Sequence, residues 1–296
     1  MIFRFIFDHQ EEHTVVKMCE VLKVSTSGYY KWRDRRAQAG AGKPAVKQEL
    51  RQKISKSFHE SFSTYGSPRI QKDLNDWGYL VSQKTVARHM KTLGLRATPI
   101  QKYIGTTDSN HSHPIYPNLV NRRFQATRPD QIWVADITYI WTLEGWLYLA
   151  SIMDLFSRKI ISWSLDTHLK KELPVAVLKR ALEIRRPTAD LIHHSDRGSQ
   201  YCSKVYTDLL RDPAIQISMS RKGDPYDNAC IESFHATLKK EWIYRKRYAT
   251  RIEARRDIAA YIDTFYNARR KHSTLGFQSP NHFEAHYRFL NVEKIA

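Results

Sequence analysis

Residues 193–201 read HHSDRGSQY, and residues 223–241 read GDPYDNACIESFHATLKKE. Asp196 follows a short apolar run and Glu232 lies in a helical pattern, with 35 residues between these two carboxylates. A third carboxylate, Asp136, interrupts the apolar run QIWVADITYI at residues 131–140. The spacing and the surroundings of these three residues predict a metal-binding acidic triad.

The position of Asp136 inside a β-branched and aromatic run needs a physical explanation. Burying an unpaired carboxylate costs more free energy than strand propensity returns, so something must compensate its charge. A buried basic partner, a raised pKa or a divalent cation would each do so. Three separated carboxylates without regularly spaced Cys or His favour a hard cation such as Mg²⁺ or Mn²⁺.

The helix expected around Glu232 has two distinct stripes, spaced by three or four residues. The apolar stripe consists of Ile231, Phe234, Leu238 and Trp242. The polar stripe on its flank consists of Asn228, Glu232, His235 and Lys239. A solvated polar edge would give the same pattern, but the two upstream aspartates favour a helix that borders a cleft.

Three motifs carry a family resemblance. Residues 136–138 read DIT, residues 194–201 read HSDRGSQY, and residues 227–229 read DNA, with ESF following at 232–234. They resemble the D,D-35-E signature of retroviral-integrase-type transposases. From about Ser67 to Phe283 the chain is similar to the catalytic, second-frame protein of insertion sequences of the IS-three family.

The resemblance implies a DNA transposase, which cleaves phosphodiester bonds and transfers strands at the ends of a mobile element. Asp136, Asp196 and Glu232 would be both the catalytic residues and the ligands of two Mg²⁺ or Mn²⁺ ions. Double-stranded DNA, as element ends and as target, would be the partner. Two or more copies would join the ends, and a first-frame protein would assist recognition.

Other residues near the triad are candidates for DNA contacts. We expect Lys239 to lie over a phosphate beside the cut, and His194 or Arg197 to orient the substrate. Asp154 is a rival carboxylate, but its place before Ser157 and Arg158 favours a turn role.

The element order supports an α/β, ribonuclease-H-like core with a mixed five-stranded sheet. After Pro129 the pattern predicts three antiparallel strands, a helix at 170–185, a strand ending at Asp196, a helix at 203–210, a strand at 214–219 and the Glu232 helix. The resemblance places the first aspartate on the first strand and the second just after the fourth.

Composition limits the partners. The chain has 48 Lys and Arg against 30 Asp and Glu, a net charge of +18, which indicates a polyanion such as nucleic acid. No apolar run approaches the roughly 20 residues of a membrane span, and MIFRFIF at the start does not have the features of a signal peptide. The three cysteines show no CxxC spacing, which is consistent with a reducing cytoplasm. We expect the protein to act in the cytoplasm of a bacterium and to associate with the nucleoid there.

We predict five segments: an N-terminal helical segment at 1–42, a helix-turn-helix DNA-binding domain at 43–98, a connector at 99–128, the catalytic core at 129–247 and a basic C-terminal helix and tail at 248–296. An all-α domain therefore precedes the core. Residues 37–44 are expected to be a linker, and the C-terminal segment either contacts DNA or is a solvated helix.

The first two segments contain several expected helices. Residues 12–38 would form two short helices, as a partial helix-turn-helix or as a plain helical hairpin. In the next domain we expect Lys84, Arg88 and Lys91 to face outward towards DNA, although a solvated basic face is the alternative. The inward positions are predicted to be Val46, Leu50, Ile54, Phe58, Ile70, Leu74, Trp77, Val86, Met90 and Leu93. In the C-terminal helix they are Ile252, Ile258, Ile262 and Phe265.

Two other functions remain open from the sequence. A ribonuclease-H-type nuclease or resolvase would cleave any DNA end without joining strands. A non-catalytic DNA-binding regulator would need no divalent metal, but an acidic triad would weaken its affinity for phosphates.

Overall fold

The computed structural model describes residues 1–40, 43–97, 114–188, 190–211, 215–222 and 224–292. The chain divides into two compact units, Met1–Ala97 and Thr98–Ala296. The finer division into five segments stays a prediction, and the first half of the expected connector at 99–128 lies outside the described residues.

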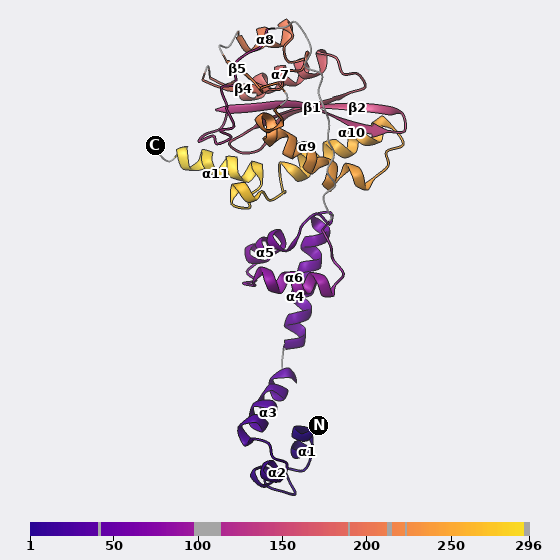
Figure 1. Ribbon diagram of the computed structural model, residues 1–296, viewed down its shortest axis with the longest axis vertical. Helices are drawn as coiled ribbons and strands as arrows, with labels where there is room; N and C mark the ends of the chain where they lie inside the picture. Colours follow the sequence, from indigo (N-terminus) through magenta and orange to yellow (C-terminus); the bar gives the residue numbers. More distant parts are fainter. Residues whose placement is uncertain (41–42, 98–113, 189, 212–214, 223, 293–296) are drawn as a thin grey trace. The chain divides into compact units, whose positions relative to one another are not determined.

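The described part of the first unit is helical (Figure 1). Its helices are α1 (Ile2–Asp8), α2 (Val15–Val21), α3 (Thr26–Gly40), α4 (Lys43–Glu60), α5 (Ser67–Asp76) and α6 (Gln83–Thr92). The sequence pattern does not predict α1, which is too short to show a helical period. Ile6 of α1 is fully buried against Met18 and Tyr29, so packing rather than propensity stabilises this helix.

The predicted linker at 37–44 is wrong at both ends. Helix α3 continues to Gly40, and α4 already begins at Lys43. Ala37 and Ala39 belong to α3, and alanine has the highest helix propensity of all residues, which outweighs the single glycine, Gly40, at the end of this helix.

Helices α4, α5 and α6 form the predicted helix-turn-helix, and local signals set their ends. Pro68 lies in the first turn of α5, and the Ser82 side chain accepts the N–H of Thr85 to cap α6. Of the predicted inward residues, those buried are Ile54, Phe58, Ile70, Leu74, Val86 and Met90. The prediction is wrong for three residues near helix ends, whose side chains are exposed: Val46, Trp77 and Leu93.

The second unit is built on the predicted mixed five-stranded sheet, in the order β3-β2-β1-β4-β5. The strands are β1 (Ile132–Thr142), β2 (Gly145–Asp154), β3 (Ile160–Asp166), β4 (Ile192–Ser195) and β5 (Gln216–Met219). Strands β1, β2 and β3 pair antiparallel, whereas β4 runs parallel to β1 and β5 parallel to β4. This topology confirms the ribonuclease-H-like α/β fold.

Helices cover both faces of this sheet, with α7 and α8 on one side and α9 and α10 on the other (Figure 1). The helices are α7 (Glu172–Arg185), α8 (Lys204–Arg211), α9 (Ala229–Glu241), α10 (Arg251–Ala259) and α11 (Pro280–Val292). Shorter elements are 3-10 turns at Pro225–Asn228, Ile243–Arg245 and Ser273–Leu275, and a π-helix at Ala260–Tyr266. No helix in the described parts of the chain has the length and apolar character needed to cross a membrane.

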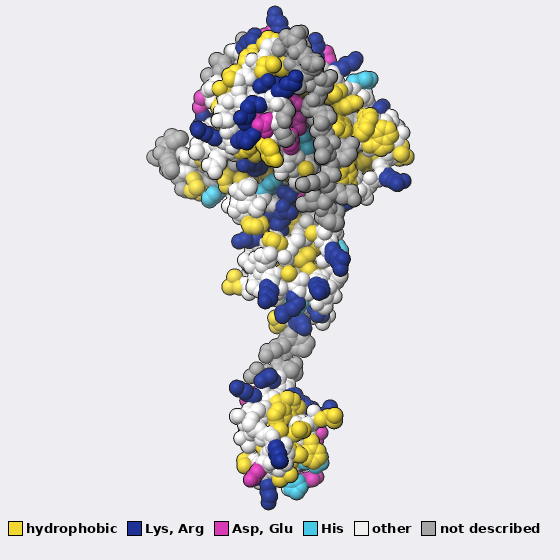
Figure 2. All heavy atoms as spheres, in the orientation of Figure 1, with side chains coloured by type: hydrophobic (Ala, Val, Ile, Leu, Met, Phe, Trp, Pro, Cys, Tyr) yellow, Lys and Arg dark blue, Asp and Glu magenta, His cyan; other side chains and the backbone are white. Residues whose placement is uncertain are grey.

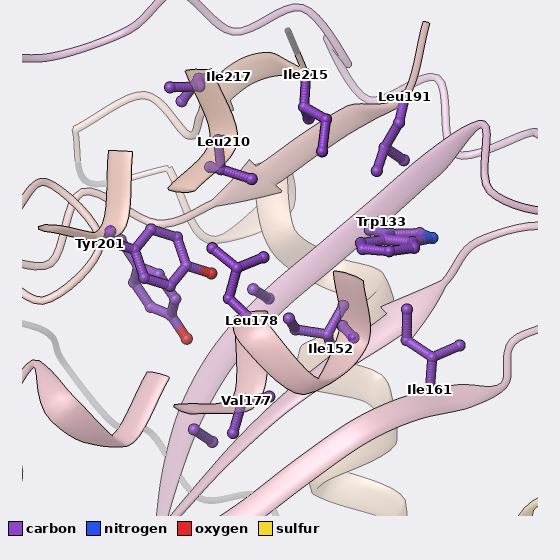
Figure 3. Close-up of a cluster of buried hydrophobic side chains, with 14 of the residues drawn as sticks. Trp133, Ile152, Ile161, Val177, Leu178, Leu191, Tyr201, Leu210, Ile215 and Ile217 are labelled. Carbon is purple, nitrogen blue, oxygen red and sulfur yellow. The ribbon is translucent and has the colours of Figure 1, made fainter. Parts of the chain in front are cut away.

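The main core lies between the sheet and α7. Figure 3 shows Trp133, Ile152 and Ile161 of the sheet together with Val177 and Leu178 of α7. Trp133 and Ala135 of β1 belong to this core, and successive strand residues point to opposite faces. The alternation therefore directs Asp136 to the other face, where α9 packs.

The C-terminal segment is fixed to the core through polar side chains. The Asn267 amide accepts the N–H of Ile160 and donates to the Ile160 carbonyl, both at 3.0 Å. The Arg270 guanidinium donates to both carboxylate oxygens of Glu241 at the end of α9. Because Arg270 is only 5% exposed, it is not available to contact DNA. Ile252 is also not the core residue that its spacing suggests, because it lies in the exposed first turn of α10.

Candidate active site

The register of the sheet brings the two aspartates together. Ala135 of β1 pairs with Ser195 of β4 in parallel, so Asp136 and Asp196 occupy the next positions along two neighbouring strands. Neighbouring strands are about 4.8 Å apart. Two residues far apart in the sequence thus come together at the carboxyl end of β4.

Helix α9 brings Glu232 to the same place. The Asn228 side chain donates to the Ala135 carbonyl at 3.3 Å, and the Nδ1 atom of His235 lies 3.2 Å from Oδ2 of Asp136. Glu232 lies between Asn228 and His235 on the same flank of the helix. The polar stripe predicted from the sequence therefore runs along β1 at the position of Asp136.

The three carboxylates affect one another electrostatically. Partial burial raises the pKa of Glu232, and the negative charges of Asp136 and Asp196 raise it further, to about 7. A nearby positive charge would stabilise the charged form of a carboxylate in such a site. The structure therefore brings the three predicted residues into one acidic cluster.

The chemistry of this cluster suits a divalent cation, although its side chains are oriented towards protein partners. Asp136 contacts His235, and Oδ1 of Asp196 accepts the N–H of Gly198 at 2.9 Å. Among the described residues, no three His, Cys, Asp or Glu side chains are arranged closely enough to hold a metal. Carboxylate oxygens are the ligands that Mg²⁺ and Mn²⁺ prefer.

Gly198 is required by the position of Asp196. A Cβ atom at Gly198 would lie 3.0 Å from Oδ1 of Asp196. A larger residue would therefore require the Asp196 carboxylate to shift by a few tenths of an ångström. This gives the glycine of the HSDRGSQY motif a steric role.

His235 is a site residue that the sequence prediction missed. It is 4% exposed, and its Nε2 atom lies 2.8 Å from Oγ of Ser151, while Nδ1 faces Asp136. An ionised carboxylate only accepts hydrogen bonds, so Nδ1 donates to Asp136, while Nε2 forms a hydrogen bond with the Ser151 hydroxyl. The sequence feature that could have identified His235 is its position on the polar stripe, beside Glu232.

His194, by contrast, is not positioned to contact DNA. It is 0% exposed, with Nδ1 lying 2.8 Å from Oγ of Ser218 and Nε2 lying 3.2 Å from Oγ of Ser220. Burial lowers its pKa to about 4, so the ring is neutral at pH 7. The expectation that His194 orients the substrate is therefore wrong, because β4 places this side chain inside the sheet.

Arg197 and Lys239 lie at the border of the acidic cluster, and both are partly exposed. Nε of Arg197 donates to the Ser220 carbonyl, which holds the side chain next to Asp196. The Lys239 ammonium lies 4.8 Å from the ring centre of Tyr139. Burial lowers the pKa of Lys239, and the charge of Asp136 opposes this shift.

Two nearby aspartates have structural roles. Asp154 is buried and accepts the backbone N–H groups of Asp130 and Phe156, as expected for a turn residue. Hydrogen bonds from the Arg221 side chain hold the pKa of Asp227 well below its usual range. Neither carboxylate is free to bind a ligand.

In the first unit, Lys84, Arg88 and Lys91 are exposed on α6, opposite the buried Val86 and Met90. Figure 2 shows that Lys and Arg side chains are more frequent than acidic ones on the face drawn. The exposed basic side chains of α6 agree with the orientation that we predicted.

A mixed sheet with carboxylates on its first strand, after its fourth strand and on the helix after its fifth strand defines the class of integrase-type polynucleotidyl transferases. The family models described as "Integrase core domain" match residues 126–225 and 213–280, and the model described as "HTH-like domain" matches residues 45–103. The chain is 39% identical to the transposase InsF for insertion sequence IS3A of Escherichia coli K12 over 288 residues, which cover 96% of this chain and 98% of the relative. The chain belongs to the IS3 family of transposases, and its activity is DNA transposition and integration.

The chain is also similar to other proteins. The chain is 43% identical to the insertion element IS600 uncharacterized 31 kDa protein of Shigella sonnei over 270 residues, which cover 91% of this chain and 98% of that protein. Among solved structures, a simian T-cell lymphotropic virus intasome matches with a TM-score of 0.46 and 15% identity, over 78% of this chain and 74% of the viral chain. The HTLV-2 integrase catalytic core in complex with magnesium matches with a TM-score of 0.43 and 13% identity, over 54% of this chain and 99% of that one.

Proposed function

We propose that Asp136, Asp196 and Glu232 are the catalytic residues of this transposase and that they bind two Mg²⁺ or Mn²⁺ ions. This proposal is supported by the register of β1 and β4, which pairs Ala135 with Ser195 directly before the two aspartates, and by the contacts that Asn228 and His235 of the Glu232 flank make with β1. When bound, such ions activate the attacking oxygen and stabilise the leaving oxygen at a phosphodiester. The two aspartates and Glu232 would hold them at the edge of the sheet.

The residues around the triad would position the DNA. His235 would keep Asp136 in a fixed orientation through its hydrogen bonds to Asp136 and Ser151. Lys239 and Arg197 would approach the phosphates next to the scissile bond, because both lie at the border of the acidic cluster. These contacts would place one phosphodiester against the carboxylates.

The same proposal extends to the DNA and to the assembly. Helix α6 would bind double-stranded DNA through Lys84, Arg88 and Lys91, and the substrates would be the element ends and the target. Two or more copies would act together on the DNA, with a first-frame protein as a further partner. The protein would act at the nucleoid in the bacterial cytoplasm.

The test uses full-length protein, Mn²⁺ and DNA that carries the ends of the element. Asp196→Asn should abolish both nicking and joining of strands while binding to the same DNA persists. Asp208→Asn is the matched control, because Asp208 is an exposed aspartate on α8. Nicking by Asp196→Asn at the wild-type rate would refute the assignment.

The same assay separates the alternative functions. Cleavage without joining, on any end sequence, would favour a nuclease or resolvase. Binding of DNA with no cleavage at all in Mn²⁺ would favour a regulator.

A further inference from the structure

An exposed aromatic group covers the closed end of the β1–β2 hairpin. Trp141 is 56% exposed and Trp146 is 41% exposed, and Tyr139 lies next to them, partly buried. We call these three side chains the hairpin platform. Figure 2 shows a broad hydrophobic area on the right side of the second unit, where Figure 1 places the hairpin end. Single exposed apolar residues are ordinary on a protein surface, but a contiguous group marks a binding site.

The rings of the platform hold one another in place. Trp141 and Trp146 are directly opposed in the sheet, with ring centres 4.9 Å apart and planes at 73°. Tyr139 and Trp146 are 5.3 Å apart at 87°. In such edge-to-face pairs each ring fixes its neighbour, so little conformational entropy is lost when a flat ligand binds.

The turn below the platform is also fixed. Oγ1 of Thr142 donates to the Gly145 carbonyl at 2.7 Å, and the N–H of Leu143 donates to the Tyr248 carbonyl at 3.0 Å. Gly145 has a φ of +104°, which a residue with a Cβ atom rarely adopts. The platform is therefore part of a rigid hairpin.

The platform lies close to the acidic cluster, with Tyr139 on the opposite face of β1 from Asp136 and with Lys239 near both residues. Tyr139 lies three residues after Asp136 on β1, a distance of about 10 Å at 3.3 Å per residue. The Lys239 ammonium lies 4.8 Å from the Tyr139 ring centre, and Lys239 is on α9, two turns after Glu232. A strand of DNA held at the carboxylates would reach the platform within a few nucleotides.

The charge around the platform favours nucleic acid. Lys239 borders it on one side, and on the other the guanidinium of Arg251 lies 3.1 Å from where a Cβ atom of Gly145 would be. Flat aromatic faces with cations beside them suit nucleobases with their phosphates.

A second copy of this chain is a less suitable partner for the platform, because it has the same net charge of +18 and does not complement these cations. A stable protein interface also needs roughly 800 Å² on each side, more than three rings supply.

We propose that the hairpin platform stacks on unpaired nucleobases of the DNA strand that is processed at the acidic cluster. Bases inside a duplex already stack on each other on both sides, whereas an unpaired base can insert its whole face against Trp141 or Trp146. The ligand is therefore a short single-stranded extension next to the scissile phosphate. The location of that phosphate rests on the proposed function of the triad.

The experiment measures binding in EDTA, so that it does not depend on metal or on cleavage. Full-length protein is titrated with fluorescent duplexes that are identical except for a blunt end or an extension of three unpaired nucleotides. One unpaired base is 2-aminopurine, whose fluorescence decreases when it stacks. The variants are Trp141→Ala/Trp146→Ala, the conservative Trp141→Phe/Trp146→Phe, and Phe289→Ala as an exposed aromatic control on α11.

We expect wild-type protein to bind the extended duplex roughly tenfold more tightly than the blunt one and to quench 2-aminopurine. The double alanine variant should bind both duplexes equally and leave the fluorescence unchanged, whereas the phenylalanine and Phe289→Ala variants should behave like wild type. Equal binding of both duplexes by wild type, or a preference that persists in the double alanine variant, would overturn the proposal.

Two further measurements make these outcomes unambiguous. An unchanged melting temperature would show that the double alanine variant is folded. If that variant only converted an oligomer into a monomer in sedimentation, the platform would be a protein interface and the proposal would be wrong. Asp196→Asn should keep the preference for the extended duplex, so failure of the triad assignment and failure of the platform can be distinguished.

Discussion

His235 on α9 directly contacts Asp136 on β1, with Nδ1 lying 3.2 Å from Oδ2. The other ring nitrogen lies 2.8 Å from Oγ of Ser151 on β2. One buried imidazole thus connects the helix that carries Glu232 to two strands of the sheet. The orientation of the Asp136 carboxylate depends on this connection, because a buried carboxylate keeps the rotamer in which its hydrogen bonds are satisfied.

We predict that His235→Ala weakens metal binding, because the Asp136 carboxylate loses the partner that orients it. Loss of such a supporting hydrogen bond costs about 10- to 100-fold in metal affinity or activity. The Mn²⁺ concentration for half-maximal strand cleavage should rise by that factor, and the increase in melting temperature on adding Mn²⁺ should become smaller at a fixed concentration. His286→Ala changes an exposed histidine and should alter neither measurement.

Acid should destabilise the second unit through His193 on β4. Burial lowers the pKa of His193 to about 3, with a smaller contribution from His194, and the ring nitrogen Nε2 lies 3.0 Å from the hydroxyl of Tyr206. The unfolded chain binds this proton below its ordinary pKa of 6.5, whereas the folded protein does not, so stability decreases as the pH falls from 6.5 towards 3.

When the pH falls from 7 to 5, His193 should lower the free energy of unfolding by about 2 kcal/mol. Urea unfolding at both pH values should show that His193→Gln loses about 2 kcal/mol less than wild type over this interval. His286→Gln serves as the exposed control and should follow wild type. The explanation fails if the pH dependence of His193→Gln equals that of wild type.

The ion pair between Arg270 and Glu241 should stabilise the second unit mainly by avoiding an unpaired buried charge. Arg270→Met removes the two guanidinium hydrogen bonds that the Glu241 carboxylate accepts, and we expect a loss of about 3 to 5 kcal/mol in the free energy of unfolding. Arg270→Met/Glu241→Met should recover much of this loss, because neither charge remains.

The control for this pair is Arg211→Met, which removes an exposed partner of Asp208 and should cost less than about 1 kcal/mol. Urea unfolding measures all three variants. If the double variant is as unstable as Arg270→Met, then packing of the Arg270 side chain, and not its charge, holds the C-terminal segment.

The basic face of α6 should contribute to DNA affinity through phosphate contacts. Replacing Lys84, Arg88 and Lys91 by alanine should weaken binding and reduce the slope of log affinity against log salt by roughly 2 to 3, since each phosphate contact contributes about 0.9. Lys179→Ala/Arg180→Ala removes two exposed cations of α7 and should leave the slope unchanged. An unchanged slope in the α6 variant would mean that this face is only solvated.

Local sequence patterns predicted much of the fold. Alternation and β-branched residues located β1 to β5, and Pro68 and Ser82 marked the starts of α5 and α6. The errors fall where burial depends on what lies nearby. Trp77 and Leu93 continue a helical period but end at exposed helix termini, and Arg270 has a charge typical of a DNA contact but is buried.

The sequence by itself determined which residues could form the site. The acidic residues, their spacing and the strand and helix patterns around them follow from the identity and order of the amino acids, because propensity and periodicity act over a few positions. Only the tertiary structure decided how these residues meet. The parallel register of β1 and β4 brings Asp136 beside Asp196, and the packing of α9 makes His235 a partner of Asp136 while β4 buries His194. Pairing and packing join segments distant in the chain, and the free energy of those contacts depends on surroundings that no local pattern contains.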